Sequence, residues 1–270
     1  MSIVGQEQTL SEISRIFDIF KSSGQLIKPH FVLSGPSGSG KTLLISTLAE
    51  QHGINFLEIN AAQLTKEGTS GNSLSKALAP LMDFPDVPTI VSVDEWDKLF
   101  ISGNSNSSKA SETTTEVQNE FLKILEGETA TVFGPYGSYP SVSLKKVLFV
   151  FAGAFNNEQN ITLDRLREIG VKTEFLGRVG LVFNTQPLDL ESLYSILETS
   201  PLLQNYVELF GNVPKEEVIE RLRVHLKTNF EMNSLGARMI NTLIHQYFIK
   251  GGVVENTATE AVTFQRKLTF

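Results

Sequence analysis

The sequence has 270 residues, of which 41% are hydrophobic and 20% charged; these are the proportions of an ordinary globular protein and exclude a disordered or fibrous chain. Acidic residues (30) outnumber basic residues (23), and the resulting formal net charge of -7 argues against wrapping of nucleic acid as the main task. At ~100–200 residues per domain, this length allows one large domain or two modest ones.

The chain contains no cysteine, which excludes disulfides, Cys-ligated zinc, iron–sulfur clusters and thiol catalysis within these residues. The four histidines lack the spacing of a catalytic zinc motif. Residues Met1–Gln8 have neither a basic region nor an apolar run, so we expect no secretory signal. The longest apolar run, residues 147–155, is far shorter than the ~20 residues of a membrane span. We therefore expect a soluble cytoplasmic protein with no membrane contact.

Short apolar runs alternate with helical patterns over the first two thirds of the chain, which is typical of a parallel α/β sheet. A first amphipathic helix is predicted around residues 10–20, and a second follows residue 41 and stops near Gly53. A further helix is predicted around residues 117–125, before a hairpin-like stretch at 127–140. The predicted strands are residues 31–34, 54–59, 89–93, 147–152 and 179–183.

The strand pattern nearly vanishes after Pro187, and helical stripes take its place. We therefore expect an α/β domain over residues 1–186 and a small helical domain over residues 187–270. The stretch 102–115 is almost wholly Ser, Thr, Asn and Gly, and its composition predicts a mobile loop.

Residues 35–42 match the P-loop pattern in full and lie between a predicted buried strand and a predicted helix. Glycines let the backbone curl so that its N–H groups and the helix N-terminus point at phosphate oxygens. The lysine can reach the β- and γ-phosphates, and the threonine hydroxyl can ligate Mg²⁺. A chance glycine-rich turn is the weaker interpretation. The predicted nucleotide-binding residues are Gly35, Pro36, Ser37, Gly38, Ser39, Gly40, Lys41 and Thr42.

The predicted strand at 89–93 ends in two carboxylates, Asp94 and Glu95. Successive side chains at a strand end diverge, so the two can hold different tasks. Asp94 would bind Mg²⁺, together with Thr42 and partly through water, and Glu95 would polarise the water that attacks the γ-phosphate. An exposed acidic pair is common at strand ends, but its combination with the P-loop favours a site that hydrolyses a nucleoside triphosphate.

At this point the sequence resembles the AAA+ ATPases and, among them, the ClpX-type protein unfoldases. The resemblance extends over nearly the whole chain and includes the P-loop, the stretch Asp94–Lys98, the stretch Val117–Gly127 and the strand exit at Leu148–Phe155. It implies an α/β P-loop domain followed by a helical lid, with ATP and Mg²⁺ as ligands.

The resemblance also implies roles for residues outside the P-loop. Ile3–Gln8 looks like the box that lines the adenine pocket, which assigns Val4 and Gly5 to nucleotide binding. Arg178, in Glu174–Arg178, would be the arginine finger that reaches a neighbour's γ-phosphate, and Arg238, in Leu235–Arg238, would be the sensor-2 arginine. Both guanidinium groups then count as catalytic, with Lys41 and Glu95. A finger that acts on a neighbour implies a homo-oligomeric ring, most simply a hexamer.

Three features depart from the resemblance. The first pore loop of the unfoldases has an aromatic–aliphatic pair between glycines, whereas here Thr69 and Ser70 stand between Gly68 and Gly71. Small hydroxyls bury little apolar area, so their grip on a threaded chain is weak. About twenty residues separate Phe155 from Glu174, which leaves no room for a long peptidase-docking loop. Without that loop, we expect no barrel peptidase as a partner. The lack of cysteine excludes a Cys-ligated zinc domain within these residues, which in the unfoldases docks adaptors and substrates.

Two functions remain open from the sequence. The first is a ring-forming ATPase that remodels a protein or a protein assembly and is directed to its target by a recruiting partner. The alternative is an ATP-dependent switch or loader that acts on DNA or nucleoprotein complexes, which the polar residues of the first pore loop suit. The acidic net charge places nucleic acid second.

Overall fold

The structure is a computed structural model, and it describes residues 3–65, 71–100, 108–211, 213–232 and 235–252. The described residues form two compact units. The α/β unit comprises those of Glu7–Pro36 and Lys41–Thr185, and the helical unit comprises those of Met1–Gln6, Ser37–Gly40 and Gln186–Phe270.

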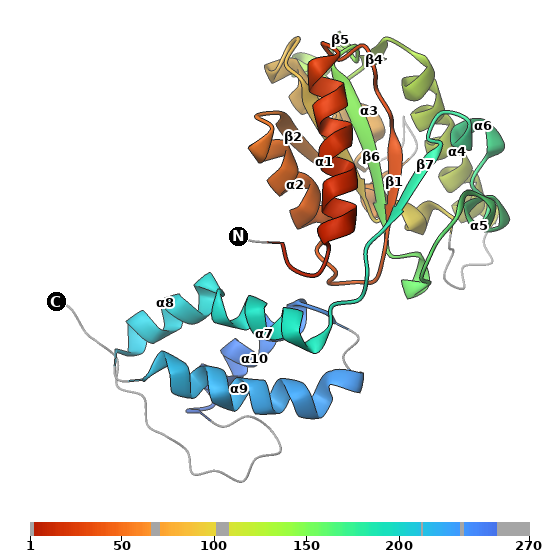
Figure 1. Cartoon of the computed structure of the whole chain (residues 1–270). Coiled ribbons are helices and arrows are strands. Elements are labelled where there is room, and N and C mark those ends of the chain that lie inside the picture. Colours follow the sequence, from red (N-terminus) through yellow and green to blue (C-terminus); the bar gives the residue numbers. More distant parts are fainter. Residues whose placement is uncertain (1–2, 66–70, 101–107, 212, 233–234, 253–270) are drawn as a thin grey trace. The chain divides into compact units, whose positions relative to one another are not determined.

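The α/β unit is built on a parallel sheet whose five strands lie in the order β2-β3-β6-β1-β7 (Figure 1). Most residues of β1, β3 and β6 are buried, as expected for strands that are covered on both faces. The predicted α/β fold class is therefore confirmed. The strands are β1 (Phe31–Ser34), β2 (Asn55–Asn60), β3 (Thr89–Asp94), β6 (Val147–Gly153) and β7 (Leu181–Asn184).

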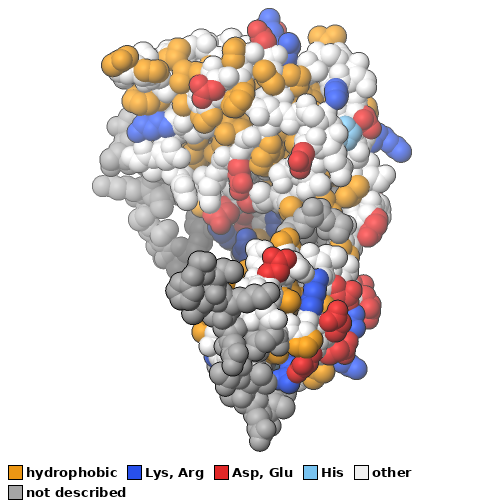
Figure 2. All heavy atoms as spheres, turned by 90° about the vertical axis from the view of Figure 1, so that its left-hand side faces the viewer, with side chains coloured by type: hydrophobic (Ala, Val, Ile, Leu, Met, Phe, Trp, Pro, Cys, Tyr) orange, Lys and Arg blue, Asp and Glu red, His pale blue; other side chains and the backbone are white. Residues whose placement is uncertain are grey.

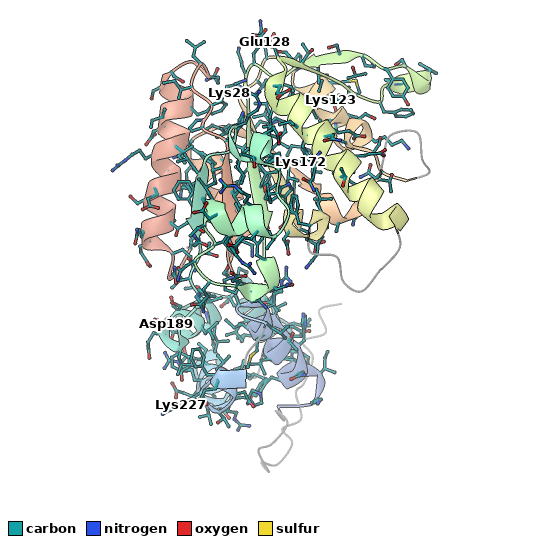
Figure 3. All side chains as sticks on the ribbon, turned by 90° about the vertical axis from the view of Figure 1, so that its right-hand side faces the viewer. Lys28, Lys123, Glu128, Lys172, Asp189 and Lys227 are labelled. Carbon is teal, nitrogen blue, oxygen red and sulfur yellow. The ribbon has the colours of Figure 1, made fainter. Side chains whose placement is uncertain are left out.

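Helices cover both faces of this sheet. The helices α1 (Glu7–Ser22) and α2 (Lys41–Gln51) lie on one side, and α4 (Ser108–Glu126) lies on the other (Figures 1 and 3). Alternate strand residues such as Val91, Val93 and Phe151 pack with Phe121 of α4 in one continuous core. Because side chains alternate along a strand, the intervening residues face the layer of α1 and α2.

Shorter elements complete the α/β unit. A small antiparallel hairpin pairs β4 (Thr129–Thr131) with β5 (Ser141–Ser143), so the hairpin predicted at 127–140 extends beyond Pro140 to include its second strand. Short helices α5 (Leu163–Glu168) and α6 (Thr173–Leu176) precede β7, and α3 (Leu74–Ala77) precedes β3. The 3₁₀ turns are η1 (Ala61–Gln63), η2 (Ala79–Asp83), η3 (Trp96–Leu99), η4 (Pro135–Gly137) and η5 (Phe155–Asn157).

Two sequence-based expectations require correction. The stretch 102–115 was expected to be a loop, but α4 already begins at Ser108, while residues 101–107 lie outside the described residues. The weak helix propensity of Ser and Thr is overridden because this stretch continues directly into an amphipathic helix whose apolar face is buried. The last strand begins at Leu181 rather than Val179, because Val179 still belongs to the turn after α6, where its N–H donates to Phe175 O.

The helical unit contains α7 (Leu190–Glu198), α8 (Pro201–Phe210), α9 (Lys215–Asn229), the turn η6 (Phe230–Met232) and α10 (Arg238–Ile249). Its core includes Leu193, Leu222 and Tyr247. Asp189, labelled in Figure 3, caps α7 by accepting a hydrogen bond from Ser192 N at 2.8 Å. The bonds from Ser192 lower the pKa of the Asp189 carboxyl, because they stabilise its charged form.

The described residues include no helix that is long and apolar enough to cross a membrane.

On the face of the molecule drawn in Figure 2, hydrophobic side chains gather toward one end of the α/β unit, whereas charged side chains are denser on the helical unit. The exposed apolar residues Leu26, Ile27, Phe84 and Val87 lie in segments that precede β1 and β3. They therefore lie near the amino ends of the strands, at the sheet edge opposite the P-loop.

Candidate functional site

The P-loop lies where the sequence predicted it, between the carboxyl end of β1 and the start of α2. Gly35 and Gly40 have φ values of +151° and +88°, which an L side chain rarely adopts. A Cβ on Gly35 would also lie 1.8 Å from Thr185 Oγ1 on the segment that follows β7. Gly40 has open space around it, so its need for glycine comes from the backbone conformation alone.

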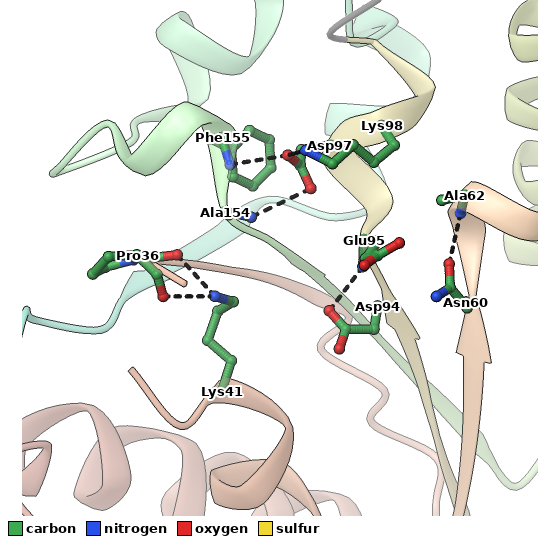
Figure 4. Close-up of polar contacts among 11 residues, drawn as sticks. Pro36, Lys41, Asn60, Ala62, Asp94, Glu95, Asp97, Lys98, Ala154 and Phe155 are labelled. Carbon is green, nitrogen blue, oxygen red and sulfur yellow. Dashed lines mark hydrogen bonds and ion pairs between the residues drawn. The ribbon is translucent and has the colours of Figure 1, made fainter. Parts of the chain in front are cut away.

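Lys41 folds back over the loop that precedes it. Its ammonium donates to the carbonyl oxygens of Gly35 at 2.8 Å and Pro36 at 3.0 Å, and the residue is only 9% exposed (Figure 4). A buried ammonium requires such partners, because desolvation of an unpaired charge is costly. The arrangement keeps a positive charge inside the loop, where a phosphate oxygen can compete with the two carbonyls for it.

A hydrogen bond joins the P-loop helix to the end of β3. Thr42 Oγ1 donates to Asp94 Oδ2 at 2.8 Å, so the two predicted metal ligands lie together. Mg²⁺ in nucleotide sites takes few protein ligands and completes its shell with phosphates and water. One hydroxyl and one carboxylate at this separation fit such an ion. No group of three or more His, Cys, Asp or Glu side chains suited to a metal occurs among the described residues.

The chain turns sharply after Asp94. Glu95 has φ 54° and ψ 28°, a left-handed conformation that costs a non-glycine residue free energy, and its N–H donates to Asp94 Oδ1 at 2.7 Å (Figure 4). The Glu95 side chain is exposed, while Asp94 is half-buried. The two carboxylates therefore occupy different environments, as their different predicted tasks require.

A third carboxylate and an amide lie on the neighbouring strand β2. Partial burial and, second, the negative charge of Asp94 raise the pKa of the Glu58 carboxyl above its ordinary value. Asn60 pairs with Asp94 in the sheet register, and its side chain accepts from Ala62 N at 2.9 Å. Sequence reasoning missed both residues, because nothing in the sequence shows that β2 pairs with β3.

Asp97 is the most deeply buried carboxylate near the site, at 1% exposure. Its oxygens accept from Ala154 N at 3.3 Å and Phe155 N at 3.1 Å, and Lys98 Nζ lies 3.3 Å away (Figure 4). These bonds tie the turn after β3 to the exit of β6. Phe155, Asn156 and Asn157 all have positive φ there, an arrangement that needs an external constraint. Asp97 falls within the stretch Asp94–Lys98 that resembles the unfoldases, but the sequence predicted no role for this carboxylate.

The predicted arginine finger, Arg178, lies just after Gly177, the C-cap residue of α6. Its Nε and Nη2 donate to Glu126 Oε1 at 3.1 Å and 2.7 Å, and the side chain is 45% exposed. In the described part of the chain these bonds join it to the end of α4, and no hydrogen bond joins it to Lys41, Thr42 or Asp94. An exposed arginine at the surface of the α/β unit can meet a group supplied by another molecule.

The remaining predicted residues belong to the helical unit, which includes residues 37–40 of the P-loop. Within it, Arg238 begins α10, and its Nη1 lies 3.2 Å from Ser37 Oγ. Gly5 has φ +73°, and a Cβ there would lie 2.8 Å from Ser192 Oγ. Val4 is half-buried beside it in the sequence. Gly38 has φ +73° and its carbonyl accepts from Ala237 N at 3.1 Å.

Gly68, Thr69 and Ser70, which replace the aromatic pore-loop pair, lie outside the described residues. The residues that flank them are fixed to each other. Thr65 N donates to Asn72 O at 2.9 Å, and Lys76 Nζ donates to Gly71 O at 2.8 Å. Thr65 and Asn72 are therefore neighbours in space.

Comparison with known proteins agrees with this geometry. The family model described as the ATPase family associated with various cellular activities (AAA) matches residues 31–172, which is more than half of the chain. The chain belongs to this family of ATPases.

Among individual proteins, the chain is similar to two bacterial subunits. It is 32% identical over 260 residues to the ATP-dependent Clp protease ATP-binding subunit ClpX 2 of Wolinella succinogenes, covering 82% of this chain and 65% of that protein. It is 28% identical over 233 residues to the ClpX subunit of Porphyromonas gingivalis, covering 69% of this chain and 56% of that protein. The chain thus spans less than two thirds of the length of these curated relatives.

We predict that Asp97→Ala destabilises the α/β unit by about 2–4 kcal/mol, because the amides of Ala154 and Phe155 lose their acceptor. Asp97→Asn keeps an acceptor oxygen and should cost less. Asp164→Ala, which removes a carboxylate with 83% side-chain exposure, is the matched control, with an expected change below about 0.5 kcal/mol. Urea unfolding followed by circular dichroism measures all three. An unfolding midpoint of Asp97→Ala equal to that of the wild type would contradict the prediction.

Proposed function

We propose that this chain is the ATP-hydrolysing module of a homo-oligomeric ring, most simply a hexamer, that remodels a protein or a protein assembly. The observation that supports it most directly is the pairing of Thr42 with Asp94, beside a lysine held inside the P-loop. In a member of the AAA family, this arrangement suits the phosphates of ATP and one Mg²⁺ ion.

The proposed roles follow from charge and position. The P-loop amides and Lys41 bind the phosphates, and Thr42 and Asp94 hold Mg²⁺, which when bound neutralises phosphate charge. Glu95 accepts a proton from the water that attacks the γ-phosphorus, while the bond to the leaving ADP oxygen breaks. Val4 and Gly5 contact the adenine.

Two arginines complete the proposed site. Arg238 binds the γ-phosphate within its own subunit, and Arg178 reaches the γ-phosphate of ATP bound to the neighbouring subunit. A guanidinium group suits both tasks, because it stays charged and forks onto phosphate oxygens. The exposure of the Arg178 side chain supports this role, since an arginine finger must extend from its own subunit into the site of the neighbouring subunit.

The remodelling part of the proposal comes from the similarity to the two ClpX subunits. Their names describe ATP-binding subunits of a protease. We propose a related action on proteins, but with a weak grip at Thr69 and Ser70 and without a barrel peptidase as partner. A recruiting protein would then select the target.

We predict that Lys41→Ala abolishes binding of a fluorescent ATP analogue. Glu95→Gln should bind the analogue normally but release phosphate about 10²–10⁴-fold more slowly, since it loses only the general base. Lys145→Ala, which removes an exposed lysine of the β5–β6 segment, is the control and should change neither property. A Glu95→Gln variant that keeps wild-type turnover would exclude Glu95 as the base.

The shared site can be tested by mixing inactive variants. Arg178→Ala and Glu95→Gln should each hydrolyse ATP at least ~10²-fold more slowly than the wild type. Mixed rings place an intact Glu95 opposite an intact Arg178 at about a quarter of their interfaces, so activity should return on mixing. No recovery in rings shown by sedimentation to be mixed would exclude an arginine that acts between subunits.

The alternative, an ATP-dependent switch on DNA, is favoured by the polar residues of the first pore loop. We predict that unfolded protein stimulates the ATPase rate several-fold and that duplex DNA does not. The measurement compares both additions across a salt series. Counterion release makes binding to DNA weaken steeply as salt rises. If DNA stimulates the ATPase rate and this effect falls steeply with salt, the target is nucleic acid and the proposed protein target is wrong.

A further inference from the structure

The pairing of Arg178 with Glu126 is a contact of a proposed catalytic side chain to which the proposed function gives no role. Nε and Nη2 of the arginine both donate to Oε1 of the glutamate, at 3.1 Å and 2.7 Å. Both side chains are nearly half exposed. Exposed ion pairs add little to stability, so the fold alone gives weak reason for this geometry.

The position of Glu126 on its helix also indicates a task other than helix stability. Glu126 is the last residue of α4, and the C-terminus of a helix favours cations over carboxylates. Gly127 follows it, with its N–H bonded to Lys123 O at 3.0 Å, so the helix backbone ends in a closed turn at Glu126. The guanidinium of Arg178 supplies the cation that this position lacks.

A second contact holds the two segments in register. Lys172, at the start of α6, donates to Asn119 of α4. Asn119 and Glu126 are seven residues apart, which places them on the same side of α4 about two turns apart. Figure 3 labels Lys172 together with Lys123, which lies on α4 between these two positions. The segment from Lys172 to Arg178 is therefore attached to α4 at both of its ends.

The backbone of Arg178 is fixed independently of this pair. Arg178 N and Val179 N both donate to Phe175 O at 3.0 Å, and Phe175 and Val179 are almost fully buried. With the backbone held in this turn, the position of the guanidinium depends on the side-chain rotamer. A long side chain without a partner samples many rotamers, and one carboxylate oxygen that binds two of its nitrogens selects few of them.

We propose that Glu126 is a positioning residue for the arginine finger. It binds Nε and Nη2 through a single oxygen and leaves Nη1 for a phosphate oxygen of the neighbouring subunit's nucleotide. Glu126 touches no substrate itself and acts only through Arg178. This inference rests on the proposed function, because it presupposes that Arg178 acts on a phosphate.

The test is a double-mutant cycle on steady-state turnover by the full chain. Glu126→Ala should lower kcat about two- to five-fold, the factor that an exposed ion pair supports, with KM for ATP unchanged. Glu126→Gln keeps the acceptor oxygen and should retain most of the activity. In the Arg178→Ala background, Glu126→Ala should have no further effect. The matched control is Glu128→Ala, which removes an exposed carboxylate two residues away that pairs with Lys145.

A second measurement follows the pair without turnover. The Arg178 Nε–H resonance, assigned by its absence in Arg178→Ala, should shift and exchange faster with water in Glu126→Ala but not in Glu128→Ala. An unchanged resonance would overturn the inference. So would a kcat of Glu126→Ala that equals or exceeds the wild-type value, or an equal loss in the Arg178→Ala background.

The cycle also separates the two proposals. If Arg178→Ala keeps full turnover, the finger itself is absent and both proposals fail. If Arg178→Ala is slow and Glu126→Ala is not, only the positioning role fails.

Discussion

The hydrogen bond between Thr42 and Asp94 is the contact on which the site depends. It joins residues that are 52 positions apart and lies at 2.8 Å. The strands that lead to them, β1 and β3, are separated by β6 in the sheet. Because all of these strands are parallel, their carboxyl ends meet at one edge, and the loops after them converge there. The sheet order, rather than any single motif, creates the site.

Backbone strain occurs directly after both β3 and β6. Glu95 has a left-handed conformation directly after β3, and three consecutive residues after β6 do as well. Such conformations persist only where the surroundings fix them. Asp97 provides the constraint, because its buried carboxylate accepts amides from the β6 exit while its own turn follows β3. Two strained turns thus stabilise each other across the sheet edge.

The cations of the α/β part of the site are held by different kinds of oxygen. The buried ammonium of Lys41 donates to two backbone carbonyls of its own loop. An anion that enters the loop can replace these carbonyls as its partner. Arg178 instead forms an ion pair with the carboxylate of Glu126 at the surface, where water weakens the attraction between the two charges. This difference matches the proposed division of work, in which the lysine serves its own subunit and the arginine serves a neighbour.

Much of the site could be predicted from the sequence because it consists of local patterns. The P-loop and the strand that ends in Asp94 and Glu95 each depend on neighbouring residues whose spacing is visible in the chain. The α/β sheet and the later helices likewise followed from periodicity, although the start of α4 did not, since its first turns are polar. The pore-loop interpretation depends on residues 66–70, which lie outside the described residues, and it stays a prediction.

The sequence by itself determined which residue types are available for phosphate and metal chemistry and which strands and helices present them. Only the tertiary structure decided their partners: Thr42 with Asp94, Asp97 with the amides after β6, and Glu126 with Arg178. Each of these pairs joins segments more than fifty residues apart. These contacts depend on strand order and helix packing, which are set by the free energy of the whole α/β unit. The positions of the two partners in the sequence do not show that they will meet.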